Sequence, residues 1–252
     1  MELALVFDVF LGSLAGPDGL ALGPDGTLFV AQESSGEVVA VAPDGTVYVA
    51  MIGLESPEGL AWHPELGLLV VEDRPGGSLV SSVRGVLQAG LSNPEGVTVD
   101  SRGRVFYTWA RIGGPTGICR WTEEGPVPVL TLPGGFMLSG ITTGPDGLLY
   151  ACNEMPVSGL LGSVIVVSPE TRIWMPYAGG IPDAEGLRFT PDGRALMVTS
   201  EQTGSVFRVV PEEGARVCVS GLRSLEDVIF LPSGEMLVSD DAVGAVLRVR
   251  PQ

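Results

Sequence analysis

The sequence predicts an all-β fold, a six-bladed β-propeller with four antiparallel strands per blade, and three observations support that prediction. A short phrase with an acidic residue before glycine recurs along the 252 residues. Its period of about 40 residues matches four short strands and their turns. Glycine (36) and proline (20) are abundant, as tight turns require, and no long stretch has helical periodicity. We therefore expect one domain spanning residues 1–252.

The repeated phrase marks the entry to the innermost strand of each blade. Successive copies are separated by 40, 37, 44, 46 and 41 residues, counted at the residue before glycine or its equivalent. The six copies read Pro17-Asp18-Gly19-Leu20, Pro57-Glu58-Gly59-Leu60, Pro94-Glu95-Gly96-Val97, Leu138-Ser139-Gly140-Ile141, Ala184-Glu185-Gly186-Leu187 and Leu225-Glu226-Asp227-Val228.

The first unit shows the strands of a blade. Four apolar runs, at 20–22, 28–31, 38–42 and 47–51, are separated by turns that each carry a glycine. Glycine adopts the positive φ of such turns at little cost. The last unit has only three runs, at 228–231, 236–239 and 245–249, whereas an unassigned apolar run lies at 3–10. We expect that run to pair as the outer strand of the last blade and close the ring.

The composition limits the classes of function. The net charge is −16 and all 14 basic residues are arginine, so we expect no binding to nucleic acid. A lysine Schiff base is excluded. His63 is the single histidine, and it follows the innermost strand of the second unit, so we expect it in a surface turn on the face opposite the acids. A lyase of the virginiamycin type would need a well-placed histidine and is therefore disfavoured.

No apolar run is long enough for a membrane helix, so we expect no membrane contact. The first ten residues lack the basic start of a signal peptide, which favours a cytoplasmic location, although removal of an export signal is compatible with the sequence. The partner that we expect is a small-molecule substrate. The sequence leaves the choice between monomer and dimer open.

The residue before glycine begins the innermost strand and should face the central channel. Five of these six positions are acidic and one is serine: Asp18, Glu58, Glu95, Glu185, Glu226 and Ser139. The turns after the second strands lie on the same face and add a second tier of polar residues: Gln32, Glu33, Glu72, Asp73, Asn153, Glu154, Ser200, Glu201, Asp240 and Asp241. The third unit ends instead in Trp109, Ala110 and Arg111, whose large side chains we expect either to form one wall of a pocket or to pack as an ordinary loop.

A ring of carboxylates needs compensation. At about 6 Å and an effective dielectric constant near 20, each pair of like charges costs roughly 3 kcal/mol. Either some carboxylates are protonated, or a hard cation such as Ca²⁺ or Mg²⁺ neutralises them. The alternative is that the acids are solvated turn residues that point outward or bind backbone amides.

Three segments carry a family resemblance: SPEGLAWHPELGLLVVED, NPEGVTVDSRGRVFYTW and DAEGLRFTPDGRALMVTSE. They resemble the gluconolactonase/senescence-marker-protein family of six-bladed propellers and, more distantly, paraoxonases, strictosidine-synthase-like proteins and NHL-repeat propellers. The resemblance covers nearly the whole chain. It implies a divalent cation, usually calcium, held in the channel by a Glu of the first blade and by Asn and Asp of later blades.

The matching positions in this chain are Asp18, Glu95, Ser139 and Glu185, and Glu185 stands where the family has its ligand and general base. Asp replaces Glu at the first position, and Glu and Ser replace Asn at the second and third. The site is therefore more acidic than the family pattern. Glu58 and Glu226 are expected as additional or alternative ligands. Mg²⁺, Zn²⁺ and Mn²⁺ are alternatives to Ca²⁺.

The function predicted is a metal-dependent hydrolase of lactones or related esters. Glu185 is the expected catalytic base, the expected metal ligands are the five channel acids, and the expected substrate-binding residues are Ser139, Asn153, Trp109 and Arg111. One alternative is a non-hydrolytic enzyme of the strictosidine-synthase kind, in which a channel glutamate acts without metal. The other is a propeller that binds a ligand and performs no chemistry.

Overall fold

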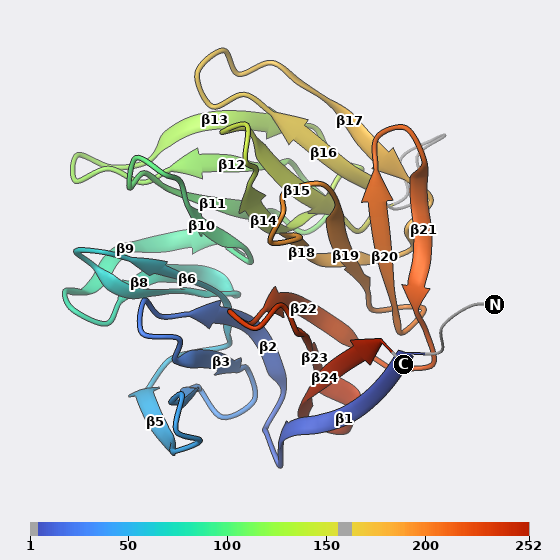
Figure 1. Cartoon of the computed structure of the whole chain (residues 1–252). Coiled ribbons are helices and arrows are strands. Elements are labelled where there is room, and N and C mark those ends of the chain that lie inside the picture. Colours follow the sequence, from blue (N-terminus) through green and yellow to red (C-terminus); the bar gives the residue numbers. More distant parts are fainter. Residues whose placement is uncertain (1–4, 156–162, 252) are drawn as a thin grey trace.

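The computed structural model describes residues 5–155 and 163–251 and confirms the six-bladed propeller. The chain forms six four-stranded antiparallel sheets, the blades, which we number 1 to 6 from the sheet that begins at Pro17. Figure 1 shows the blades arranged in a ring, with blade 1 (blue) beside blade 6 (red). Within residues 5–155 and 163–251, no helix is both long and apolar enough to span a bilayer.

In blades 1 to 5 the four strands run in chain order outward from the channel. In blade 6 the outermost strand is the first strand of the chain. Blade 1 contains β2 (Pro17–Leu22), β3 (Leu28–Gln32), β4 (Glu37–Val41) and β5 (Val47–Ile52). Blade 2 contains β6 (Pro57–His63), β7 (Gly67–Glu72), β8 (Pro75–Ser81) and β9 (Gly85–Ser92). Blade 3 contains β10 (Val97–Val99), β11 (Val105–Ala110), β12 (Thr116–Arg120) and β13 (Val127–Leu132).

The second half of the ring repeats this order. Blade 4 contains β14 (Leu138–Thr143), β15 (Leu149–Asn153), β16 (Ser163–Val167) and β17 (Trp174–Gly179). Blade 5 contains β18 (Ala184–Phe189), β19 (Leu196–Ser200), β20 (Ser205–Val210) and β21 (Gly214–Val219). Blade 6 contains β22 (Leu225–Phe230), β23 (Met236–Asp240), the short 3-10 helix η1 (Asp241–Val243), β24 (Ala245–Pro251) and β1 (Leu5–Gly12).

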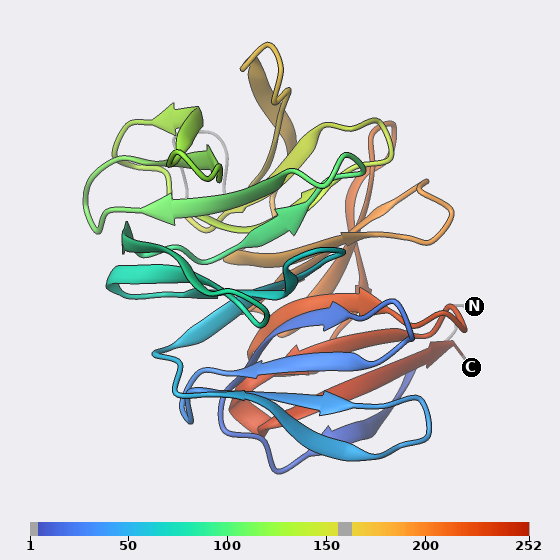
Figure 2. The same ribbon diagram turned by 90° about the vertical axis from the view of Figure 1, so that its left-hand side faces the viewer.

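The expected ring closure is confirmed. Strand β1 pairs antiparallel with β24, with Val9 opposite Leu247, and so provides the outer strand of blade 6. Figure 2 shows blue segments of the chain beside the red strands at this junction. The strand ends at Gly12, two residues beyond the expected run, and residues 3 and 4 of that run lie outside the described part. Because β24 is covered, blade 6 does not present it as an unpaired edge.

The apolar core lies between neighbouring blades. The second strand of five blades (β3, β7, β15, β19 and β23) is buried along its whole length, whereas outer strands such as β5 are largely exposed. Separate apolar clusters fill the spaces between blades; one joins Leu20 and Val30 of blade 1 to Leu237 and Val246 of blade 6. These contacts hold the inner strands, and therefore the channel lining, in fixed positions.

The acid–glycine pair forms an irregularity in the innermost strand. In blade 1 the ladder to β3 is interrupted between Pro17 and Leu20, and blades 2, 4, 5 and 6 show the same interruption. In blade 3 the corresponding pair precedes β10. The two residues are thus released from regular pairing, and such bulges redirect side chains. This local bend turns the acids toward the channel.

The glycine of the pair allows neighbouring blades to approach closely. A β-carbon on Gly19 would collide with the carbonyl oxygen of Glu58 in blade 2, and the equivalent collision occurs at the next four blade contacts. Blade 6 is the exception, because Asp227 occupies this position. Its Oδ2 accepts a hydrogen bond from the Leu20 amide of blade 1 at 2.9 Å. At the junction of blades 6 and 1, a side chain therefore lies between the two inner strands.

The expectation of a surface position for His63 is wrong. The residue ends β6 and is buried. Its Nδ1 accepts the amides of Glu65 and Leu66 at 3.0 and 3.1 Å, which leaves the proton on Nε2 to bind the Gly103 carbonyl of blade 3 at 3.0 Å. The ring thus joins two blades by binding backbone groups of both, and it lies on the face opposite the acids, as expected.

Candidate functional site

One mouth of the channel opens into a cavity of about 300 Å³ that we call the acid cavity. It is formed by the turns that enter the innermost strands and by the turns that follow the second strands. Eleven acidic residues line it: Asp18, Glu33, Glu58, Asp73, Glu95, Glu154, Glu185, Glu201, Glu226, Asp227 and Asp241. All five predicted channel acids are among them, so the prediction that the acids face the channel is confirmed.

A backbone hydrogen bond repeated in the blades joins the two tiers. The amide of the residue after the second strand donates to the carbonyl two residues before the channel position: Asp73 to Ser56 at 2.9 Å, Glu154 to Met137 at 3.0 Å and Glu201 to Asp183 at 3.1 Å. This bond brings the upper acid of each blade to the same end of the channel as the lower acid. The two-tier arrangement is therefore a property of the repeat.

In five blades the second tier is a pair of consecutive residues. The second residue of each pair lines the cavity, whereas the first turns away from it. Gln32, Glu72 and Asn153 each end a second strand, and their side-chain oxygens accept the amides of Ala15, Glu55 and Met137. These bonds hold the entry turns in place. Ser200 and Asp240 also bind backbone groups, so five of the ten second-tier residues are structural.

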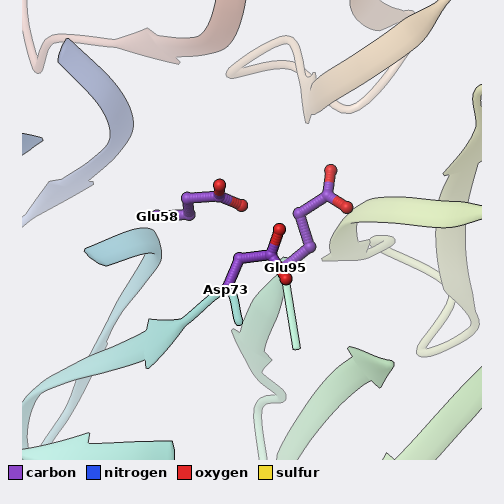
Figure 3. Close-up of side chains that lie close together, drawn as sticks. All are labelled: Glu58, Asp73 and Glu95. Carbon is purple, nitrogen blue, oxygen red and sulfur yellow. The ribbon is translucent and has the colours of Figure 1, made fainter. Parts of the chain in front are cut away.

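Among residues 5–155 and 163–251, three groups of carboxylates converge at the acid cavity, and all their members except Asp183 line it. In each group, one oxygen per residue lies within 4.8 Å of the others. Figure 3 shows the first group, in which Glu58 and Asp73 of blade 2 approach Glu95 of blade 3. The groups are Glu58–Asp73–Glu95, Glu95–Glu154–Glu185 and Asp183–Glu185–Glu201. Glu95 and Glu185 each belong to two groups, so the three form one continuous chain across blades 2 to 5.

Three of the five predicted metal ligands belong to the chain of carboxylates, and two do not. Glu58, Glu95 and Glu185 belong to the chain of carboxylates, whereas Asp18 and Glu226 belong to none of its groups. The charged neighbour with the largest effect on Asp18 is Asp227, and that of Glu226 is Asp18, which places both beside the junction of blades 6 and 1. The first-blade position taken from the family pattern thus lies outside the carboxylate groups.

Sequence reasoning missed Asp183 as a candidate ligand. It lies in the entry turn of blade 5, two residues before Glu185, with a positive φ of 50°. Ser56 and Asn93 adopt similar conformations at the equivalent turns. The sequence did contain a signal for this residue, because Asp183 is a second acid two positions before the channel acid Glu185.

Four predicted substrate-binding residues do not line the acid cavity. Ser139 is fully buried and its hydroxyl donates to the Ala184 carbonyl at 2.9 Å. Asn153 is also buried, with its amide group bonded to backbone atoms. Trp109 packs against the apolar cluster between blades 2 and 3, and Arg111 is exposed on the loop beyond it. Neighbouring backbone groups already bind Ser139 and Asn153. For Trp109 and Arg111 the structure agrees with the alternative of ordinary packing rather than a wall of the acid cavity.

Blade 4 contributes an upper-tier acid but no lower one, because its channel position is the buried Ser139. Glu154 of this blade meets Glu95 and Glu185 of blades 3 and 5. Asp73 likewise meets Glu58 and Glu95, and Glu201 meets Glu185. Contact between the two tiers is therefore a general feature of the cavity.

Burial and mutual repulsion raise the pKa of six cavity acids: Asp18, Glu58, Glu95, Glu154, Glu185 and Glu226. Desolvation is the main cause at each of the six, followed by neighbouring charges. The pKa of Glu95 is well above its usual range, with Glu154 its strongest charged neighbour, and that of Glu185 is raised by burial and then by Glu154. Burial and Asp183 raise the pKa of Glu154 to about 7; burial and Asp18 raise that of Glu226 to about 9.

The donor set of the acid cavity fits a hard cation. Asp73 Oδ1 and Glu154 Oε1 are buried and have no hydrogen-bond partner within the described residues, and each belongs to a carboxylate group. Unpaired buried acceptors are costly, and a cation would satisfy them. Oxygen ligands suit Ca²⁺ and Mg²⁺ better than Zn²⁺.

Comparison with known proteins identifies the fold. No protein-family model and no curated protein sequence matches the chain. A gluconolactonase from Xanthomonas campestris superposes with a TM-score of 0.74 at 14% identity, over 98% of this chain and 89% of that one. An auxiliary nutrient binding protein from Bacteroides thetaiotaomicron gives 0.77 at 12% identity, over 98% and 76%.

Virginiamycin B lyase from Staphylococcus aureus gives a TM-score of 0.65 at 13% identity, over 98% of this chain and 89% of that one. These similarities extend across nearly the whole chain. At such low identity they establish the shared propeller and leave activity to be argued from the site. The resemblance to gluconolactonases is confirmed at the level of fold.

Proposed function

We propose that this protein is a metal-dependent hydrolase of lactones or related esters, with Ca²⁺ as the expected cation. The observation that carries the proposal is the chain of carboxylate groups, with its two unpartnered buried oxygens, at one mouth of the channel. A gluconolactonase of the same fold supports the choice of reaction class.

Glu95, Glu154 and Glu185 are the central ligands of the proposal, and Glu58 and Asp73 extend the donor set. Once bound, the cation supplies Lewis-acid polarisation of the substrate carbonyl and stabilises its developing negative charge. Asp18 and Glu226, which belong to none of the carboxylate groups, hold protons or position the substrate. The ring glycines fix the blade spacing on which these distances depend.

Glu185 is the proposed general base. In the ionised form, its carboxylate accepts a proton from the water that attacks the carbonyl carbon. It returns that proton to the ring oxygen as the carbon–oxygen bond breaks, which gives the hydroxy acid. Burial and then the charge of Glu154 raise the pKa of Glu185, which makes its carboxylate a stronger base.

The test is hydrolysis of a panel of lactones and esters by protein loaded with Ca²⁺. We expect turnover of at least one small lactone, loss of that turnover with a chelator, and a fall of at least about 100-fold in Glu185→Gln. Glu37→Gln, which removes one charge outside the cavity, is the matched control and should retain the activity. Absence of turnover across the panel would refute the proposal.

The alternatives predict other outcomes of this experiment. Activity that persists after metal removal would favour a strictosidine-synthase-like use of a channel glutamate. Ligand binding without turnover would favour a binding propeller, as the nutrient binding protein of the same fold illustrates. Lyase chemistry is disfavoured: a histidine-to-alanine variant of virginiamycin B lyase is catalytically inactive, and His63 here binds backbone groups on the opposite face.

A further inference from the structure

The other mouth of the channel opens into a second cavity, of about 640 Å³, with the opposite chemical character. We call it the apolar cavity. Trp62, Phe189, Phe230, Pro191 and Pro232 contribute to its wall. Within the described part of the chain, no Asp or Glu lines it and Arg188 is its one basic residue. That composition is unexpected in a protein with 30 acidic residues and a net charge of −16.

Arg188 lies at the inner end of the apolar cavity, because its side chain also lines the acid cavity beyond. It extends from β18 and is partly exposed. Its Nη2 donates to the Leu20 carbonyl at 3.4 Å and lies 3.7 Å from Asp227 Oδ2. Its Nε is buried and has no acceptor among the described residues. A guanidinium has five N–H donors, so most of its hydrogen-bonding capacity is unused.

The shape and lining of the cavity suit a small ligand. Its volume falls within the range of about 300–1,000 Å³ that is usual for small-molecule sites. The wall is rigid on one side, where Trp62 stacks on Phe29 with ring centroids 5.8 Å apart. An apolar body would gain from burial here, and a carboxylate would match the fork of guanidinium donors.

We propose that the apolar cavity is a second binding site, for a small apolar molecule that carries one carboxylate. The carboxylate binds the guanidinium of Arg188, and the apolar part lies against Trp62, Phe189 and Phe230. A neutral ligand would offer the unpartnered Nε of Arg188 no charged acceptor, and the described lining contains no Asp or Glu to attract a cation. This site is separate from the proposed hydrolytic site and does not depend on it.

Octanoate is the probe, with octanamide as the neutral molecule of the same shape. Metal-free protein is used so that no cation in the acid cavity attracts the carboxylate. Calorimetry should show one octanoate per chain with a Kd of about 0.1–1 mM. Octanamide should bind at least about 10-fold more weakly, the loss expected for a charge-assisted bond. The fluorescence of Trp62, isolated by comparison with Trp62→Phe, should change on binding.

Two substitutions locate the site. Arg188→Met keeps the apolar stem and should reduce the preference for octanoate over octanamide to less than about 2-fold. Ser233→Asp places a negative charge on the exposed lip of the cavity, in a turn where Asp25, Asp146 and Asp192 occupy the equivalent position in other blades. It should weaken octanoate binding by about 5-fold at low salt, whereas the neutral Ser233→Asn should leave it unchanged.

The proposal is overturned by any of three results: no octanoate binding up to 10-fold above the expected range of about 0.1–1 mM, equal affinity for octanoate and octanamide, or an affinity unaffected by Ser233→Asp. If Arg188→Met does not fold, the comparison of Ser233→Asp with Ser233→Asn still tests the proposal. Failure of the lactone panel leaves these results unchanged, so the two proposals are tested separately.

Discussion

Glu95 and Glu154 come from different tiers of adjacent blades, yet their carboxylate oxygens lie within 4.8 Å of each other. At that separation and an effective dielectric constant near 20, two full charges would repel by about 3.5 kcal/mol. The raised pKa of both groups is one response, and a bound cation is the other. The following predictions separate these states.

Neutralising Glu154 should stabilise the metal-free protein and weaken its response to Ca²⁺. Glu154→Gln removes a buried charge beside Glu95 and Glu185, so we expect a gain of at least about 1 kcal/mol at pH 8, or roughly 2–4 °C in Tm. The same variant lacks a ligand and should show a smaller rise in Tm with Ca²⁺. Thermal unfolding measures both effects. Glu37→Gln should behave as the unmodified protein, and a destabilised Glu154→Gln would contradict the account.

The stability of the metal-free protein should fall as the pH rises. The folded pKa values of Glu154 (about 7) and Glu226 (about 9) exceed those of the unfolded chain, so the folded state binds more protons. The stabilisation is complete below about pH 4.5 and is lost as the pH rises through these folded values. Tm should decrease from pH 5 to pH 9.

Added Ca²⁺ should reverse this trend, because the cation competes with protons for the same oxygens. The increase in Tm with Ca²⁺ should therefore be larger at pH 9 than at pH 5. A Tm of the metal-free protein that is flat or rises over this range would show that the cavity acids are not held in the protonated form.

Asp227 should stabilise the junction of blades 6 and 1. Asp227→Gly restores the residue found at the other five positions but removes the acceptor for the Leu20 amide and the partner of Arg188. We expect a loss of about 1–3 kcal/mol in the free energy of unfolding, measured in urea. Asp227→Asn retains an acceptor oxygen and should lose less. Equal stability of all three proteins would rule out this role.

His63 should matter for stability and not for function. His63→Phe leaves the buried Leu66 amide, the Glu65 amide and the Gly103 carbonyl without their partner, so we expect a loss of about 1–3 kcal/mol. Calcium binding and hydrolysis per folded molecule should be unchanged, since the residue lies on the opposite face. A selective loss of activity in a fully folded variant would contradict this assignment.

Much of the fold could be predicted, because the repeat period and the glycine turns determine strand count and connectivity. The spare first strand and the incomplete last blade also predicted ring closure. Strand alternation predicted correctly that the five channel acids share one mouth. Which of these acids meet could not be predicted, since that depends on the bulge at each acid–glycine pair and on the spacing of blades.

Three residues illustrate that limit. Ser139 occupies the predicted channel position, but it binds the Ala184 carbonyl, and Glu154 is the acid of blade 4 that meets the lower ring. Asp227 replaces a glycine whose role as a close contact between blades is visible only in three dimensions. Arg188 was not singled out, because no local motif distinguishes an arginine that lies between two cavities.

The central claim is that the chain of carboxylates around Glu95 binds a cation, and direct titration tests it best. Metal-free protein at pH 8 is titrated with Ca²⁺ by calorimetry, beside Glu95→Gln and the control Glu37→Gln. We expect saturable binding in the unmodified protein and the control, with affinity reduced at least about 10-fold in Glu95→Gln, as expected when one charged ligand is lost. The claim is contradicted if Ca²⁺, Mg²⁺ and Mn²⁺ all fail to bind, or if Glu95→Gln binds Ca²⁺ as tightly as the unmodified protein.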